Sequence, residues 1–154
     1  MIRLTRQADY GILLLVHIAG EPLGSVHAAP DLATISGVPV PMVSKILKTL
    51  ARNGLLVSHR GPRGGYGLAR ASREISLADI VQALDGPIAM TACTGHEPDC
   101  GLEASCRVHP HWQRLNQVVI NALSNTSLAE MVAPLPAQFV RLQAGDRTLS
   151  FPNA

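Results

Sequence analysis

"AAPDLATISGVPVPMVSKILKTLARNG", residues 28–54, contains two short helical patterns, over residues 29–36 and 41–53, with Gly37 between them. The apolar residues of the second pattern follow the spacing i, i+3, i+4, i+7, which predicts a helix with one buried face. They are Val43, Ile46, Leu47 and Leu50. The opposite face is polar and basic and carries Ser44, Lys45, Lys48, Thr49 and Arg52. A helix, a short turn with glycine and a basic second helix form the sequence pattern of a helix-turn-helix, whose second helix enters the DNA major groove.

The segment that follows, "LLVSHRGPRGGYGLAR" at residues 55–70, predicts two short strands around a tip rich in glycine and proline. We expect the strands at residues 55–59 and 66–69. A hairpin directly after a recognition helix predicts a winged helix with Arg60 and Arg63 on the wing. Two arginines there suit the negative potential of a narrow minor groove, and the glycines would allow close approach to a phosphate or groove wall. An ordinary glycine-rich hairpin loop is the alternative interpretation.

Charge is distributed unevenly along the chain, although the net charge is only +2. Residues 32–73 contain seven basic side chains and no acidic one, whereas residues 74–103 contain six acidic side chains and no lysine or arginine. This reversal indicates that one part of the chain faces a polyanion and the next part has another role. A solvated charged surface, the alternative, normally mixes both signs.

Helices are also predicted on both sides of this region. Thr5 is a candidate N-cap for a helix that stops at Gly20, and Ser76 with Asp79 forms the pattern of a capping box for a helix over residues 77–84. A helix over residues 110–124 carries an apolar stripe, and residues 127–132 predict a last short turn. The stripe consists of Trp112, Leu115, Val119 and Leu123. It indicates a dimerisation helix, with packing inside the chain as the alternative.

Together these patterns predict a mainly α-helical fold with a small β-hairpin. A winged helix-turn-helix DNA-binding domain is expected at residues 1–85 and a ligand-binding loop at residues 86–109. A long dimerisation helix with a short terminal helix is expected at residues 110–133. The remainder, residues 134–154, contains several prolines and a glycine, and we expect a flexible tail there.

All three cysteines of the chain lie in the loop at residues 86–109, which is 24 residues long. Loops of that length are usually functional or disordered. The spacing is Cys93-x6-Cys100-x5-Cys106-x2-His109, and three thiolates with an imidazole are ligands for either zinc or an iron-sulfur cluster. Inert cysteines or a catalytic Cys106–His109 pair are further alternatives, but no α/β pattern that would form a pocket accompanies such a pair.

The expected compartment is the cytoplasm, where thiols are kept reduced. An odd number of cysteines cannot all pair within one chain. No apolar run approaches the ~20 residues of a membrane-spanning helix, and the apolar stretch at residues 11–20 is too short and lacks the cleavage site of a signal peptide. We therefore expect no membrane partner.

The chain resembles the iron-sulfur-cluster regulators of bacterial transcription, the IscR- and NsrR-like group, and most closely the branch that regulates the SUF cluster-assembly genes. Three motifs carry the resemblance across residues 1–132: "RLTRQADYGILLL" at the start, the wing "ARNGLLVSHRGPRGGYGLAR" and the cysteine triad. The resemblance implies a homodimeric winged-helix repressor or activator. Its affinity for double-stranded DNA would depend on a cluster held by Cys93, Cys100 and Cys106, and it would sense cluster status, redox stress or nitric oxide.

The resemblance leaves the fourth ligand open between two residues. In the IscR-like branch a histidine three residues after the last cysteine completes a 2Fe-2S site, and His109 occupies that place. In the NsrR-like branch an acidic residue of the first helix, from the partner subunit, completes a 4Fe-4S site, and Asp9 occupies that place. The gap between the first two cysteines is one residue longer than the usual five. We favour a 2Fe-2S cluster with His109, because this ligand is local to Cys106.

The predicted DNA contacts fall on the recognition helix and the wing. Ser44 and Lys45 are expected to contact base edges, with Pro41 and Met42 as apolar contacts. Lys48, Arg52, Arg60 and Arg63 are expected to bind phosphates or the minor groove. Two other functions compete with this interpretation: a zinc-stabilised winged-helix protein that binds DNA without sensing, and a thiol-dependent enzyme.

Overall fold

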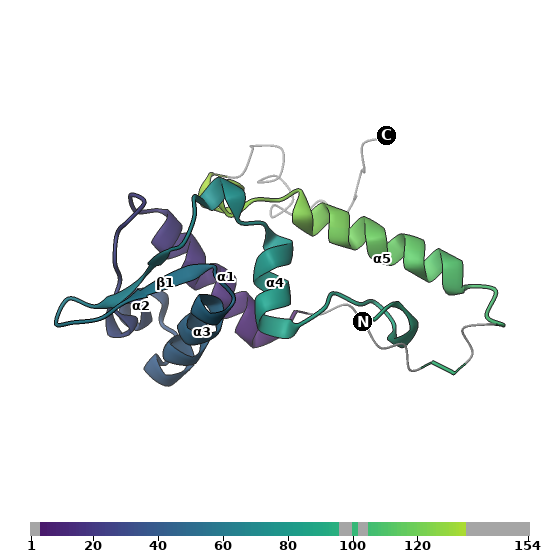
Figure 1. The fold of residues 1–154 in the computed structure, drawn as a ribbon, viewed down its shortest axis with the longest axis horizontal. Helices are drawn as coiled ribbons and strands as arrows, with labels where there is room; N and C mark the ends of the chain where they lie inside the picture. The colour runs from purple at the N-terminus through teal and green to yellow at the C-terminus, as the bar shows by residue number, and fades with distance from the viewer. Residues whose placement is uncertain (1–3, 96–99, 102–104, 135–154) are drawn as a thin grey trace, which may run out of the picture.

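The computed structural model describes residues 4–95, 100–101 and 105–134 of the chain, and Figure 1 shows the arrangement of its helices and its hairpin. In chain order the elements are α1 (Arg6–Ala19), α2 (Ala29–Ser36), α3 (Val40–Arg52), β1 (Leu56–His59), β2 (Gly65–Leu68), η1 (Ser72–Glu74), α4 (Leu77–Asp85), η2 (Ala92–Thr94), α5 (His109–Ser124) and α6 (Leu128–Val132). The predicted mainly helical fold with one antiparallel hairpin is confirmed. The predicted tail at residues 134–154 lies outside the described residues from residue 135 onward.

Helices α1 and α4 begin, and helix α2 ends, at the residues that the capping patterns indicate. The Thr5 hydroxyl accepts a hydrogen bond from the backbone N–H of Ala8 at the start of α1, at 3.2 Å. Helix α2 ends at Gly37, which adopts the left-handed conformation with φ of 71°, and this conformation favours glycine because a Cβ atom would be strained. The capping box of Ser76 and Asp79 opens α4. These local signals fix the lengths of the helices that surround the core.

The core lies where α1, α3 and α4 meet beneath the hairpin. All four residues of the predicted stripe on α3 are fully buried: Val43, Ile46, Leu47 and Leu50. They pack with Leu14 and Leu15 of α1 and with Ile80 of α4. Burying a side chain of this size stabilises the fold by roughly 1.5–3 kcal/mol, so the apolar face of α3 is held inward and its polar face is directed outward.

The wing contains a third backbone segment beside the hairpin. Tyr66 of β2 exchanges two backbone hydrogen bonds with His27, each 2.9 Å long. A Cβ atom on Gly65 would lie 2.3 Å from the carbonyl oxygen of His27, and one on Gly67 would lie 2.7 Å from that of Ser25. Gly65 and Gly67 are therefore needed where the chain packs against itself, and the expectation that the glycines of the tip allow close approach to DNA stays a prediction.

The chain returns to the winged-helix core after α5. The backbone N–H of Leu128 donates to the carbonyl of Ile75 at 2.8 Å, and that of Leu77 donates to Thr126 at 2.9 Å. Leu128 is fully buried in the same core cluster as the residues of α1 and α3. The predicted short terminal turn is thus a helix, α6, that belongs structurally to the winged-helix unit. The segment from α4 to α5 is consequently anchored at both of its ends to the winged-helix core.

Helix α5 extends beyond the winged-helix body (Figure 1). Among the described residues of α5 only Asn116 is buried, whereas Trp112, Leu115 and Val118 are 37%, 47% and 57% exposed. Within the described part of the chain, no helix is long and apolar enough to cross a membrane. The exposed apolar side of α5 is a feature of the surface that needs an explanation.

Candidate functional site

The polar face of α3 presents the residues that the sequence predicts for DNA contact. Pro41, Lys45, Lys48 and Arg52 are exposed. Ser44 is half-buried, and Met42 is half-buried because it packs against the core. The first turn of α3 contains no acidic residue, so no carboxylate opposes the approach of a phosphate to the helix N-terminus. This face is consequently basic from its middle to its end.

The wing tip places two more arginines outward. Arg60 and Arg63 are both exposed in the segment between β1 and β2. Gly61 in this segment has φ of +114°, and nothing lies within 4 Å of the position of a Cβ atom there. The tip is therefore turned by a glycine that packs against nothing nearby, unlike Gly65 and Gly67 at the base of the wing.

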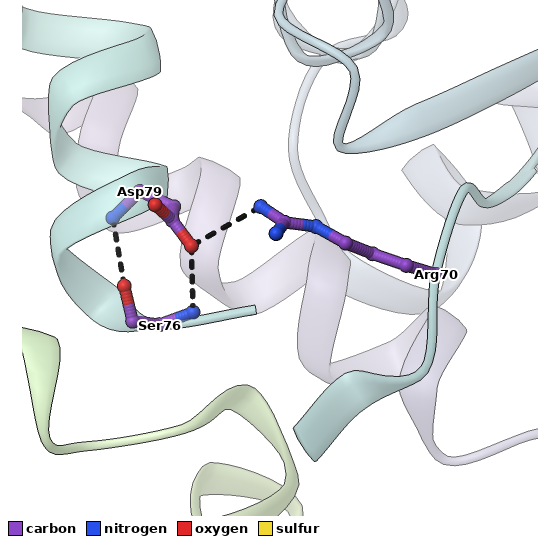
Figure 2. A network of polar contacts seen from close by, with 3 residues as sticks. All are labelled: Arg70, Ser76 and Asp79. Atoms are coloured by element: carbon purple, nitrogen blue, oxygen red, sulfur yellow. Dashed lines mark hydrogen bonds and ion pairs between the residues drawn. The ribbon is translucent and has the colours of Figure 1, made fainter. Parts of the chain in front are cut away.

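Arg70, a third arginine of the basic region, is directed to the protein itself. Its Nη2 atom lies 3.2 Å from Oδ2 of Asp79, and Figure 2 shows the same carboxylate oxygen accepting a hydrogen bond from the backbone N–H of Ser76. The arginine and aspartate side chains are 42% and 40% exposed, and a pair this exposed contributes at most about 1 kcal/mol. The basic region and the acidic region therefore meet in an ion pair between the base of the wing and the start of α4.

Cys93 lies in η2, within the loop that joins α4 to α5. Its Sγ atom is 3.2 Å from the hydroxyl of Thr91, and the Thr91 backbone N–H donates to the hydroxyl of Thr94 at 3.1 Å. Cys93 and Thr94 line an open groove between α4 and α5 with a volume of about 910 Å³. Local hydrogen bonds thus hold this half-buried cysteine at the edge of a groove.

His109 lines the same groove from the other side. It is the first residue of α5, and its backbone N–H donates to the carbonyl of Cys106 at 3.3 Å. Its Nδ1 atom is buried and has no hydrogen-bond partner among the described residues. Buried polar nitrogens are normally paired, so His109 is a candidate ligand residue at the groove.

The other predicted ligands are not brought together in the same way. Cys106 is half-buried, and Cys100 is exposed between two segments outside the described residues. Where the structure describes the chain, no three histidine, cysteine, aspartate or glutamate side chains are close enough to hold a metal ion. Asp9 lies on α1 in a separate cavity with Leu4, Thr5 and Arg6. The structure therefore joins Cys93 and His109 at one groove and leaves the complete ligand set a prediction.

Asn116 is a residue at this site that the sequence patterns did not reveal. It lines the groove together with His109 and is bonded to the loop backbone. The signal that was available is its spacing: seven residues after His109, it falls on the same side of a helix. Polar residues at His109, Gln113 and Asn116, on one side of the helix, would then have indicated a polar contact beneath α5.

The chain matches the model of the Rrf2 family, described as an iron-dependent transcriptional regulator, over residues 4–134. A candidate HTH-type transcriptional regulator of Mycobacterium tuberculosis is 31% identical over 145 residues, which cover 94% of this chain and 90% of that protein. The HTH-type transcriptional regulator IscR of Serratia proteamaculans is 29% identical over 131 residues, which cover 85% and 79%.

Solved structures show the same fold at lower sequence identity. CymR, the global cysteine regulator of B. subtilis, has a TM-score of 0.68 at 23% identity and covers 86% of this chain and 97% of its own. IscR of T. potens has a TM-score of 0.63 at 20% identity and covers 90% and 96%. The family model spans most of the chain, and the named relatives are transcriptional regulators and not enzymes. The chain accordingly belongs to the Rrf2 family of DNA-binding transcriptional regulators.

Proposed function

We propose that this protein is a homodimeric, cytoplasmic regulator whose binding to operator DNA depends on an iron-sulfur cluster held by Cys93, Cys100, Cys106 and His109. The observation that carries the proposal is the pair of potential ligands at one groove: the Cys93 thiol and the buried, unpaired Nδ1 of His109. The description of the family as iron-dependent and the IscR relatives support the choice of iron. The expected targets are genes of iron-sulfur cluster assembly, of the SUF or ISC type.

The donor set fits a cluster by its chemistry. Thiolates are the usual ligands of iron-sulfur clusters, and a histidine in place of a cysteine is compatible with a 2Fe-2S centre. A bound cluster would supply a redox-active centre that oxidants and nitric oxide can damage. We favour the 2Fe-2S type, because the backbone hydrogen bond from His109 to Cys106 makes these two ligands neighbours. A 4Fe-4S cluster with Asp9 of the partner subunit is the alternative.

Helix α5 supports the proposed homodimer by an unusual distribution of its side chains. The side facing the groove is mostly polar: it carries His109, Gln113, Asn116 and Gln117, with Ile120 as its apolar residue. Of the predicted apolar stripe, Trp112 and Leu115 are exposed and Val119 and Leu123 are half-buried, and the apolar Val118 is exposed as well. Soluble proteins rarely leave such a side uncovered, and a second copy of α5 would cover it by a two-fold contact in which the same residues meet.

Helix α4 lies between the groove and the recognition helix α3, and we propose that it couples cluster binding to DNA binding. Asp85, the last residue of α4, accepts a hydrogen bond from the backbone N–H of Thr5 at 3.1 Å and another from the Thr5 hydroxyl. The ligand loop therefore begins at a residue tied to the start of α1, and α4 also packs against α3. Two recognition helices must lie about 34 Å apart to meet successive major grooves, so a small shift of α4 would alter operator affinity.

The test of the proposed function is the composition of protein purified without oxygen. We expect a coloured solution with visible absorption and with iron and acid-labile sulfide in equal amounts. His109→Ala and Asp9→Ala then distinguish the two cluster types, since only the variant that lacks the true fourth ligand should change the visible spectrum. A colourless protein with stoichiometric zinc would contradict the proposal and favour the zinc-stabilised alternative.

Arg60 gives a separate prediction for the DNA contacts. Arg60→Ala should weaken binding to all DNA sequences and reduce the slope of log affinity against log salt concentration by about one, because one phosphate contact is lost. Arg70→Ala is the matched control: Arg70 is paired with Asp79, so its loss should leave the slope nearly unchanged. Fluorescence anisotropy titrations at several salt concentrations measure both slopes. An unchanged slope for Arg60→Ala would exclude a phosphate contact there.

A further inference from the structure

Asn116 is buried, whereas the other residues of α5 are exposed or half-buried. Only 6% of its surface is exposed, and it is the one polar side chain classed as buried in the described part of the chain. A buried amide is stable only when its hydrogen-bonding groups are satisfied, so its partners show what this residue does.

Both ends of the Asn116 amide bind the backbone of the ligand loop. Its Oδ1 accepts a hydrogen bond from the backbone N–H of Met90 at 2.9 Å, and its Nδ2 donates to the carbonyl of Ile88 at 3.3 Å. The loop has left α4 only a few residues earlier, at Asp85. One side chain of α5 therefore holds the first part of the loop at two points.

These two contacts bear on the relative positions of the proposed ligands Cys93 and His109. Met90 is three residues before Cys93. Hydrogen bonds among Thr91, Cys93 and Thr94 hold this short segment together, so the position of the Met90 backbone constrains that of the cysteine. On the other side, Asn116 follows His109 by two helical turns and lines the same groove. The amide thus connects the backbone that carries Cys93 to the helix that carries His109.

We infer that Asn116 is a positioning residue of the ligand site: by holding the loop at Ile88 and Met90 it fixes the separation of Cys93 from His109. This inference rests on the proposed function for the identity of the group that is held. The contact itself can be tested without that group.

The first experiment measures amide hydrogen exchange in the metal-free protein. Asn116→Ala should increase the exchange rate of the Met90 amide about tenfold or more, because its buried acceptor is removed. Asn116→Asp keeps an acceptor oxygen and should retain most of this protection. Asn121→Ala is the control, because among the described residues the Asn121 side chain accepts a hydrogen bond from Gln117 of the same helix and forms no hydrogen bond with the ligand loop. Equal exchange at Met90 in Asn116→Ala and in the control would overturn the inference.

The second experiment measures the loaded site in protein reconstituted without oxygen. Asn116→Ala should change the visible circular dichroism of the cluster and release iron to a chelator about ten times faster, as expected when a residue supporting a metal ligand is lost. Asn121→Ala should match the wild type. An unchanged spectrum and release rate in Asn116→Ala would overturn the positioning role. Wild-type protein that takes up no cluster would overturn the proposed function and the ligand-site role together, although loss of protection at Met90 would still establish the contact.

Discussion

Cys106→Ser is expected to abolish cluster binding. The variant purified without oxygen should be colourless and should retain less than about a tenth of the wild-type iron, because a serine oxygen is a poor substitute for thiolate at iron. Cys106 is half-buried just before α5, and its backbone carbonyl accepts the hydrogen bond from His109. Serine keeps that carbonyl and the size of the side chain, so the start of α5 should be preserved. Iron analysis and visible absorption measure the result.

Operator binding should change together with the cluster. We expect the Cys106→Ser protein to have the same operator affinity whether or not iron is supplied, whereas the affinity of the wild type should depend on iron. Val108→Ser is the matched control, because it places a serine at an exposed position next to the same turn without removing a thiol. Footprinting in cells grown with and without available iron gives the readout. Unaltered operator occupancy in serine variants of all three cysteines would contradict the cluster-dependent mechanism.

The sequence predicts the DNA-binding part of the fold well, because its signals are local. The period of the apolar residues on α3 indicates which face is buried, and the four residues of that stripe are fully buried in the structure. Caps such as Thr5 and Ser76 fix helix starts by hydrogen bonds within three residues. Signals of this kind depend on neighbours along the chain and need no knowledge of the tertiary fold.

Contacts between distant segments are what the sequence could not indicate. The pairing of His27 with Tyr66 consists of a single bridge and leaves no alternation of apolar and polar residues. Leu128 enters the core from a helix of only five residues, which is too short for a helical period to be recognised. In both cases the structural role comes from tertiary packing. Sequence periodicity can be recognised only over a longer stretch of residues, so it cannot indicate this role.

The candidate site also has one feature that the sequence predicts, the chemistry of its residues, and one that it does not, their placement. The spacing of the cysteines and His109 identifies the ligand chemistry, because the side chains themselves determine which metals they bind. Their relative placement depends on the course of an irregular loop. That course is set by contacts such as those of Asn116 with Ile88 and Met90, which link residues 26 to 28 positions apart. The sequence therefore predicts a candidate ligand set, whereas the contacts that support it could not be predicted.

Leu115→Lys is expected to convert the proposed dimer to a monomer. Leu115 is 47% exposed on α5, so a lysine there has room in the isolated protomer and should leave its folding unaffected. In a two-fold contact through α5 the same residue would be present on both copies, and two ammonium groups would be buried in an apolar interface without partners, which is costly. Sedimentation velocity measures the association state.

The loss of the dimer should also reduce operator affinity, because two linked recognition helices bind more tightly than one by a factor of about 100 to 10,000. We therefore expect Leu115→Lys to weaken operator binding at least about a hundredfold, while circular dichroism shows an unchanged helix content. Asn121→Lys is the control: it adds the same charge to the same helix at an exposed polar position, so it should remain dimeric and bind as the wild type does. A dimeric Leu115→Lys protein would show that Leu115 lies outside the dimer contact and would contradict the proposed pairing of α5, because a charge placed inside the contact could not be tolerated twice.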